Sequence, residues 1–171
     1  MSPSLEGVVG RELADELTQA FGRIQHCLNQ LSDEQVWHRP RMEMNSIGNL
    51  LLHLCGNVRQ WVICGLGGEP DTRNRPAEFA ERGPIPKGDL LAKLESTVDE
   101  AKIILETQTA DTWRRRLRIQ AFDTTGFGAA LHSVSHFRGH TQEIIHQSRE
   151  ILGATYDFAW VPQTKEQGAT P

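Results

Sequence analysis

The stretch HSVSHFRGHTQEIIHQ, residues 132–147, decides the fold and indicates the chemistry of this chain. It holds four histidines within fifteen residues, namely His132, His136, His140 and His146. His136 and His140 are four residues apart, so on an α-helix they lie on one face, one turn apart. Two imidazoles at that spacing can bind one metal ion, with bonds of about 2.0–2.1 Å.

The angle between each histidine and the apolar stripe of the same helix divides the four histidines into two groups. With Val134 at zero and about 100° per residue, the stripe centres near zero. His140 and His136 fall at about −120° and −160°, on the flank of the stripe, whereas His146 and His132 lie at about 120° and 160°. We therefore expect His136 and His140 to border the core and His146 to be exposed. His132 can also pair with His136, four residues later, and stays an alternative.

A third histidine comes from a second predicted helix, which begins with SIGNLLLHLCGNVRQW, residues 46–61. Ser46 or Asn45 is its expected N-cap, and the glycines of residues 65–68 end it. His53 lies at the border of the apolar stripe of this helix. Metal sites in helical bundles use side chains of facing helices, and three histidines leave a coordination position open. The pattern thus predicts a metal site of His53, His136 and His140.

The rest of the chain supplies two more long helices. Apolar residues recur at helical spacing over residues 8–30 and 89–105, and the histidine-rich helix is expected over residues 124–152. We find no convincing strand pair, so the prediction is an all-α four-helix bundle. Residues 69–88 are polar and rich in proline and glycine, which predicts a long loop that permits a crossover between the second and third long helices.

The domain boundaries and smaller segments follow from the same pattern. Residues 1–171 are expected to form a single domain with a core at about 8–153 and a C-terminal tail at 154–171. Ser32 is the expected cap of a short helical turn. Residues 107–120 are expected to form a turn and a short extended piece.

Composition excludes several classes of protein. The 171 residues carry a net charge of −4, which argues against a nucleic-acid partner. The N-terminus lacks the pattern of a signal peptide, and no apolar run reaches the roughly 18 residues of a membrane span. The three cysteines, Cys27, Cys55 and Cys64, form no CxxC pair, so we expect no disulfide framework and a cytoplasmic location.

Some polar residues are candidates to support the three histidines. Asn49, Asn57 and Gln60 can orient imidazoles by accepting their free N–H groups. Glu143 follows His140 by three residues but lies near 180° on the wheel, which predicts a surface position.

Other polar residues lie in the long connection. Arg73, Arg75 and Glu78 are candidates for the mouth of the site, although nothing in their spacing requires it.

The two quoted stretches resemble the DinB-like superfamily, also called the YfiT-like metal-dependent hydrolases. The resemblance extends from about Leu13 to Leu152, and GNLLLHLCGN and RGH within it resemble an uncharacterised, DUF1572-type branch. It implies a four-helix bundle in which His53, His136 and His140 hold one divalent metal ion. Zinc and nickel are the first candidates, followed by manganese and iron, and a homodimer is also implied.

What the resemblance implies about function divides into two alternatives. Characterised members include thiol S-transferases that use bacillithiol or mycothiol, a maleylpyruvate isomerase that requires mycothiol, and proteins induced by DNA damage. One alternative is an enzyme acting on a small molecule by thiol S-transfer or hydrolysis, with a low-molecular-weight thiol as co-substrate. The other is a non-catalytic metal-binding or stress-response protein. The residues alone also permit a bundle without metal, and they assign no catalytic base.

Overall fold

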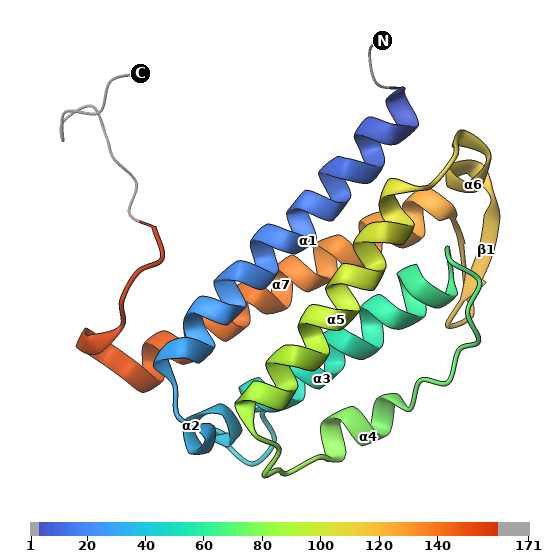
Figure 1. Cartoon of the computed structure of the whole chain (residues 1–171). Helices are drawn as coiled ribbons and strands as arrows, with labels where there is room; N and C mark the ends of the chain where they lie inside the picture. The colour runs from blue at the N-terminus through green and yellow to red at the C-terminus, as the bar shows by residue number, and fades with distance from the viewer. Residues whose placement is uncertain (1–3, 161–171) are drawn as a thin grey trace, which may run out of the picture.

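Four long helices form a bundle in the computed structural model, which describes residues 4–160. They are α1 (Leu5–Gln30), α3 (Ile47–Val58), α5 (Lys87–Glu106) and α7 (Gly126–Leu152). Helix α1 packs against α5 and α7, and α3 packs against the same two helices (Figure 1). The predicted all-α four-helix bundle is confirmed.

Seven short elements connect or extend these helices. They are α2 (Asp33–Trp37), the π-helix η1 (Arg59–Cys64), α4 (Arg75–Ala80), α6 (Ala110–Arg114), β1 (Arg116–Ile119), β2 (Phe122–Thr125) and the 3-10 helix η2 (Gly153–Thr155). The strands pair antiparallel, with Arg116 opposite Thr125. The expectation that the chain has no strand pair is therefore wrong at this one hairpin, which leads into α7.

The core is made by the apolar positions that recur every three or four residues along each long helix. Fully buried side chains come from all four long helices, including Leu17, Ile24, Leu54, Leu94 and Phe137. Each such side chain contributes about 1.5–3 kcal/mol relative to an exposed one. At the N-terminal end of α7, Phe127 and Leu131 are 41% and 46% exposed, so the apolar stripe of this helix is not buried along its whole length.

Side-chain caps fix where the two histidine-bearing helices begin. Ser46 Oγ accepts a hydrogen bond from Asn49 N, and Asn49 Oδ1 accepts one from Ser46 N, which makes a reciprocal capping box at α3. Thr125 Oγ1 accepts from Gly128 N at the start of α7. The predicted cap at Ser46 is confirmed, and these starts set the direction in which each later histidine points.

The connection between α3 and α5 returns along the side of the bundle, so that these two helices run in the same direction (Figure 1). The crossover that its length permits is thus present. Its prediction as a loop is incomplete, because it contains α4. Asn74 caps α4 through a hydrogen bond from Ala77 N, and Pro76 lies in the first turn, where its missing N–H costs nothing.

The C-terminal segment is partly described. The hydroxyl of Tyr156 lies 3.6 Å from Cys27 Sγ, and His26 Nε2 lies 2.7 Å from the carbonyl oxygen of Asp157, so this part of the tail packs against α1. The remainder of the predicted tail, 161–171, lies outside the described residues. Among those described, no helix is both long and apolar enough to cross a membrane.

Candidate metal centre

Three histidines from two helices meet between α3 and α7. His53 Nε2 lies 2.9 Å from His136 Nε2, and the ring centroids of His136 and His140 are 4.5 Å apart. One potential ligand atom from each of the three residues lies within 4.8 Å of the other two. The structure therefore brings together the three residues that the sequence predicted as ligands.

Packing of α3 against α7 sets the register of the trio His53, His136 and His140. Ser133 Oγ donates a hydrogen bond of 3.0 Å to Asn57 Oδ1, and both side chains are buried. Asn57 follows His53 by four residues, and Ser133 precedes His136 by three, so this bond lies about one turn from the trio. Asn57 thus supports the site by joining the helices and not, as predicted, by accepting an imidazole N–H.

Two of the three imidazoles contact a carboxylate through Nδ1. His53 Nδ1 lies 2.9 Å from Glu78 Oε2, and His140 Nδ1 lies 2.7 Å from Glu143 Oε2. A carboxylate accepts hydrogen bonds, so these contacts assign the proton to Nδ1 and leave the lone pair on Nε2. Such partners fix the tautomer and ring orientation of metal-binding histidines.

Arg73 holds Glu78 in place from the connection before α4. Its Nε donates to Glu78 Oε1 at 2.7 Å and its Nη2 donates to Oε2 at 2.9 Å, a bidentate ion pair with both side chains largely buried. Burial alone would raise the pKa of Glu78, but the hydrogen bonds and charges of Arg73 and His53 outweigh it and lower the pKa. Glu78 is therefore a carboxylate at neutral pH.

The histidines differ in their electrostatic surroundings. Burial, together with the neighbouring His140 and His53, lowers the pKa of His136 to about 4. His136 is therefore neutral at neutral pH, which is the form that binds metal ions. The hydrogen bond from His140 lowers the pKa of Glu143, which keeps that partner ionised as well.

Gln60 and Asn49 support the site indirectly, through Arg73 and Glu78. Gln60 Oε1 accepts from Arg73 Nη1 at 2.9 Å, and Asn49 Nδ2 donates to the carbonyl oxygen of Glu78 at 2.8 Å. Neither contacts an imidazole, so their predicted role as direct partners is wrong. Gln60 belongs to the π-helix η1, an element common near functional sites.

Two predictions for charged residues are incomplete or wrong. Glu143 lies at the surface as predicted, with 41% of its side chain exposed, but its carboxylate also contacts His140, which the wheel did not predict. Arg73 and Glu78 were candidates for the mouth of the site and instead lie directly behind His53. The one local signal for this arrangement was the Asn74 cap followed by Pro76, which marks the start of α4.

His132 lies beside the trio and outside it. Its ring packs against Trp61 at a tilt of 35° with centroids 4.1 Å apart, and its centroid is 5.9 Å from that of His136. Within the described residues, the group of side chains able to share one ion contains the other three histidines and omits His132. His146 is exposed as predicted, and its Nε2 lies 3.7 Å from Glu150.

The three cysteines lie away from the trio. Cys27 and Cys55 are buried, Cys64 is half-buried, and none of them forms a disulfide. Burial raises the pKa of the Cys55 thiol to about 11, so this group is neutral and a poor nucleophile. Cys64 is the last residue of η1, distant along the chain from His53 of α3, and its Sγ donates to the carbonyl oxygen of Pro70.

Comparison with known structures identifies the fold. A conserved protein from Enterococcus faecalis has a TM-score of 0.73 and 15% identity, and the match covers 85% of this chain and 98% of that one. A DinB-like protein, YjoA, from Bacillus subtilis has a TM-score of 0.65 and 15% identity, with 86% and 96% covered. The predicted DinB-like fold is thus confirmed.

Sequence comparison identifies the family. No curated protein matches this sequence. Residues 11–165 match the family described as "Protein of unknown function (DUF1572)", which covers most of the chain. The chain therefore belongs to this DUF1572 family, the uncharacterised branch that the sequence resembled.

Proposed function

We propose that His53, His136 and His140 bind one divalent metal ion at which the protein transforms a small molecule. The observation that carries this proposal is the convergence of three histidine nitrogens, two of them from rings held by carboxylates at Nδ1. A carboxylate behind a ligating histidine is a recurrent feature of metal sites, since it raises ligand basicity and fixes the ring.

The donor set fits a divalent ion. Bonds of about 2.0–2.1 Å in tetrahedral geometry place ligand atoms about 3.3 Å apart, close to the 2.9 Å between the His53 and His136 nitrogens. Imidazole donors suit zinc and nickel, and also manganese or iron in sites with further oxygen ligands. Glu78 and Glu143 would compensate the charge of the ion through the two rings they contact.

A site with three protein ligands favours a catalytic role over a closed structural one. When bound, the ion would act as a Lewis acid and lower the pKa of a coordinated water or thiol. This suits hydrolysis or transfer of a low-molecular-weight thiol to a small electrophile. The residues of the chain would hold the ion and orient the imidazoles around it. Both nearby carboxylates, Glu78 and Glu143, already contact imidazoles.

Metal analysis tests the binding step. Protein purified without a histidine tag should contain about one equivalent of metal per chain or take it up from zinc or nickel solution. His136→Ala should lose it, because two ligands remain. His146→Ala is the matched control, since His146 is an exposed histidine on the same helix. An empty wild-type site that accepts no ion, or equal uptake by His136→Ala, would refute the proposal.

Turnover tests the catalytic step. Metal-loaded protein should accelerate the reaction of a chromogenic electrophile with low-molecular-weight thiols, or the hydrolysis of an activated ester. His136→Ala should reduce the rate to that of the uncatalysed reaction. Equal rates for the two proteins across both reaction classes would contradict an enzymatic role.

The same geometry supports a second candidate function. The trio joins α3 to α7, so a bound ion would connect two helices of the bundle. A non-catalytic metal-binding or stress-response protein would show metal-dependent stability and no turnover. A homodimer, a cytoplasmic location, a small-molecule partner and the lack of a nucleic-acid partner remain predictions.

A further inference from the structure

The β1–β2 hairpin reaches the candidate metal centre through a series of hydrogen bonds. Gln120, in the two-residue turn of the hairpin, donates from its Nε2 to Gln60 Oε1 of η1. The same oxygen accepts from Arg73 Nη1 at 2.9 Å, and Arg73 in turn binds Glu78, the carboxylate behind His53. These four side chains form a hydrogen-bond relay from the turn of the hairpin to an imidazole of the trio.

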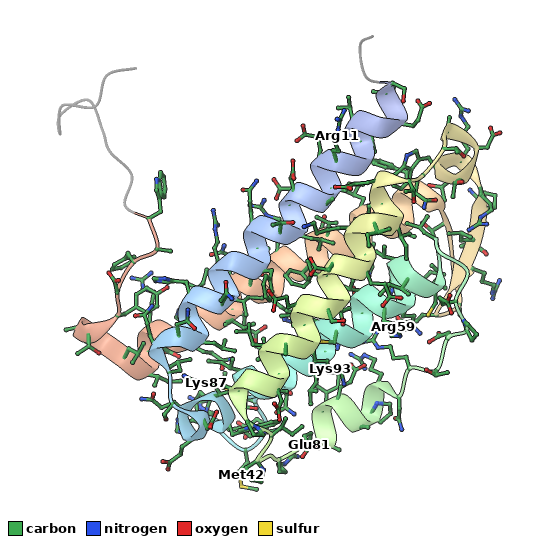
Figure 2. All side chains as sticks on the ribbon, viewed as in Figure 1. Arg11, Met42, Arg59, Glu81, Lys87 and Lys93 are labelled. Carbon is green, nitrogen blue, oxygen red and sulfur yellow. The ribbon has the colours of Figure 1, made fainter. Side chains whose placement is uncertain are left out.

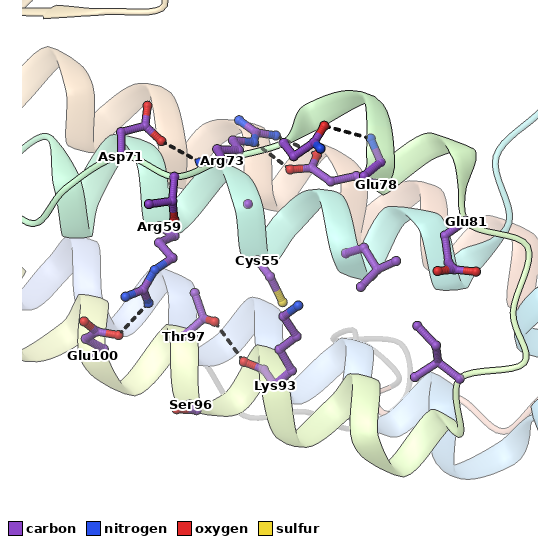
Figure 3. Close-up of a pocket in the computed structure, with 16 residues that line it drawn as sticks. Cys55, Arg59, Asp71, Arg73, Glu78, Glu81, Lys93, Ser96, Thr97 and Glu100 are labelled. Carbon is purple, nitrogen blue, oxygen red and sulfur yellow. Dashed lines mark hydrogen bonds and ion pairs between the residues drawn. The ribbon is translucent and has the colours of Figure 1, made fainter.

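The middle of the relay lies where the α4 connection runs against α3 and η1. Arg59, the first residue of η1, and Glu81, just after α4, mark the two ends of this region in Figure 2. Figure 3 shows Asp71, Arg73 and Glu78 following one another along the connection and α4, with Arg73 in the middle. Arg73 is therefore the residue through which a neighbouring element can act on Glu78.

The side-chain amide of Gln60 is held in one orientation. Its Nε2 donates to Asp71 Oδ2 at 2.7 Å, while its Oε1 accepts from Arg73 and Gln120. Exchanging the oxygen and nitrogen of the amide would place donors against donors. Gln60 is buried, and the side chain of Arg73 is only 5% exposed, so the groups of this network depend on one another for hydrogen bonds. Gln60 supplies the acceptor for Nη1, the arm of Arg73 that Glu78 does not bind.

Arg73 transmits this order to the imidazole because its guanidinium group is planar and rigid. Its Nε and Nη2 contact the two oxygens of Glu78, and its Nη1 contacts Gln60, so these three contacts fix the plane of the group. A tilt of that plane would move the carboxylate that accepts from His53 Nδ1. The orientation of His53 thus depends on a residue of η1 and, through it, on the hairpin.

Two departures from regular backbone occur at the outer end of the relay. Gln60 belongs to a π-helix, an irregularity frequent at functional sites. Gln120 and Ala121 have φ angles of 51° and 66°, in a turn where asparagine and glycine are usual. Such strained residues cluster where they serve a site, and the contact that Gln120 makes is with Gln60. Both irregularities therefore coincide with the relay.

We propose that the turn of the β1–β2 hairpin is a positioning element of the metal centre, in which Gln120 fixes His53 through Gln60, Arg73 and Glu78. The consequence for an ion rests on the proposed function, because a loosened His53 would hold the metal less firmly. The relay also provides a route of regulation. A molecule that displaces Gln120 from Gln60 would lower metal affinity, and a bound ion would by reciprocity hold the turn in place.

Competition with a chromogenic chelator at pH 7 tests the effect on metal binding. Gln120→Ala should weaken it about threefold and Gln60→Leu about tenfold, the lower end of the effect of removing a direct partner of a ligand. In the Gln60→Leu background, Gln120→Ala should have no further effect, since the relay is already broken. Two controls should bind metal like the wild type. Ala121→Gly suits the positive φ and keeps Gln120, and Gln19→Ala removes an exposed glutamine of α1.

Nitrogen-15 nuclear magnetic resonance of the histidine rings in the metal-free protein tests the relay without the ion. His53 should be protonated at Nδ1 in the wild type, and its ring signals should shift in Gln120→Ala and Gln60→Leu. The signals of His26, which contacts the C-terminal segment, should not shift. A wild type that binds no metal would remove the proposed function, whereas the His53 signals would still decide the positioning role.

Three results would overturn the proposal. They are unchanged His53 signals in Gln60→Leu, wild-type metal affinity in both relay variants of a protein that does bind metal, and an equal effect of Gln120→Ala with and without Gln60→Leu.

Discussion

The two carboxylate oxygens of Glu78 link His53, a candidate metal ligand, to Arg73 of the α4 connection. Oε2 accepts from His53 Nδ1, and both oxygens accept from Arg73. A neutral amide at this position would keep the size of the side chain while removing the charge that makes the imidazole more basic. Glu78 is therefore expected to control metal affinity without touching the ion.

Glu78→Gln should weaken metal binding by about ten- to a hundredfold, the usual effect of removing such a partner. The measurement is competition with a chromogenic chelator at pH 7. Glu81→Gln is the control, because the Glu81 side chain accepts hydrogen bonds only from backbone N–H groups next to it. A Glu78→Gln protein with wild-type affinity would show that the His53–Glu78 contact has no influence on the ion.

Glu143 shows why a helical wheel missed part of the site. The wheel places the Glu143 Cα near 180° from the core stripe, which is correct for the backbone. A long side chain on a helix leans toward the N-terminal turn, so Glu143 reaches the ring of His140 three residues earlier. The wheel predicted the three ligands because a histidine ring stays near its own Cα direction, and it failed for the longer carboxylate side chain.

At the scale of the element, α4 could be placed only partly from the sequence. The Asn74–Pro76 pattern indicates a helix start, yet six residues are too few for a periodic signal. The contact of α4 with α3 joins residues more than twenty positions apart, and the periodicity of a sequence does not predict such a contact.

The β1–β2 hairpin was missed for a local reason. Gln120 and Ala121 adopt positive φ angles in its turn, where asparagine and glycine are usual.

Gly56 allows the α4 connection to lie against α3. A Cβ atom at this position would overlap Glu78 Oε1 and come within 2.8 Å of Arg73 Nε. Gly56→Ala should therefore displace the Arg73–Glu78 pair, weaken metal binding, and lower the free energy of unfolding by about 1–2 kcal/mol, after a gain of about 1 kcal/mol in helix propensity. Urea denaturation and chelator competition measure the two effects.

Gly22→Ala is the matched control for this substitution. A Cβ at Gly22 on α1 meets no atom within 4 Å, so only the propensity gain applies. Its free energy of unfolding should rise by about 0.5–1 kcal/mol, with metal affinity unchanged. If Gly56→Ala behaves in the same way, the close approach of α4 to α3 does not constrain the site.

At the scale of the whole molecule, burying neutral His136 links folding to pH in the metal-free protein. The pKa of His136 is lowered from 6.5 to about 4 in the folded state, mainly by burial. The unfolded state binds the proton first as the pH falls, so folding stability is full above about 6.5 and declines toward pH 4. Urea midpoints of the metal-free protein should fall in this window, and more steeply than those of His136→Ala. Parallel profiles would mean that other groups cause the decline.

A bound ion would also join two helices that are distant in sequence, since α3 and α7 are separated by the whole α4 connection, α5 and the hairpin. Metal at about a hundredfold excess over its Kd should add about 2.7 kcal/mol to the free energy of unfolding. For a chain of 171 residues this raises the Tm by about 5–10 °C. Differential scanning calorimetry with zinc or nickel, followed by a chelator, measures the difference. His146→Ala should keep the full shift, and His136→Ala should lose it because the ion then has only two ligands. A wild-type Tm that responds to neither metal nor chelator would contradict metal binding at the trio, whichever reaction the protein performs.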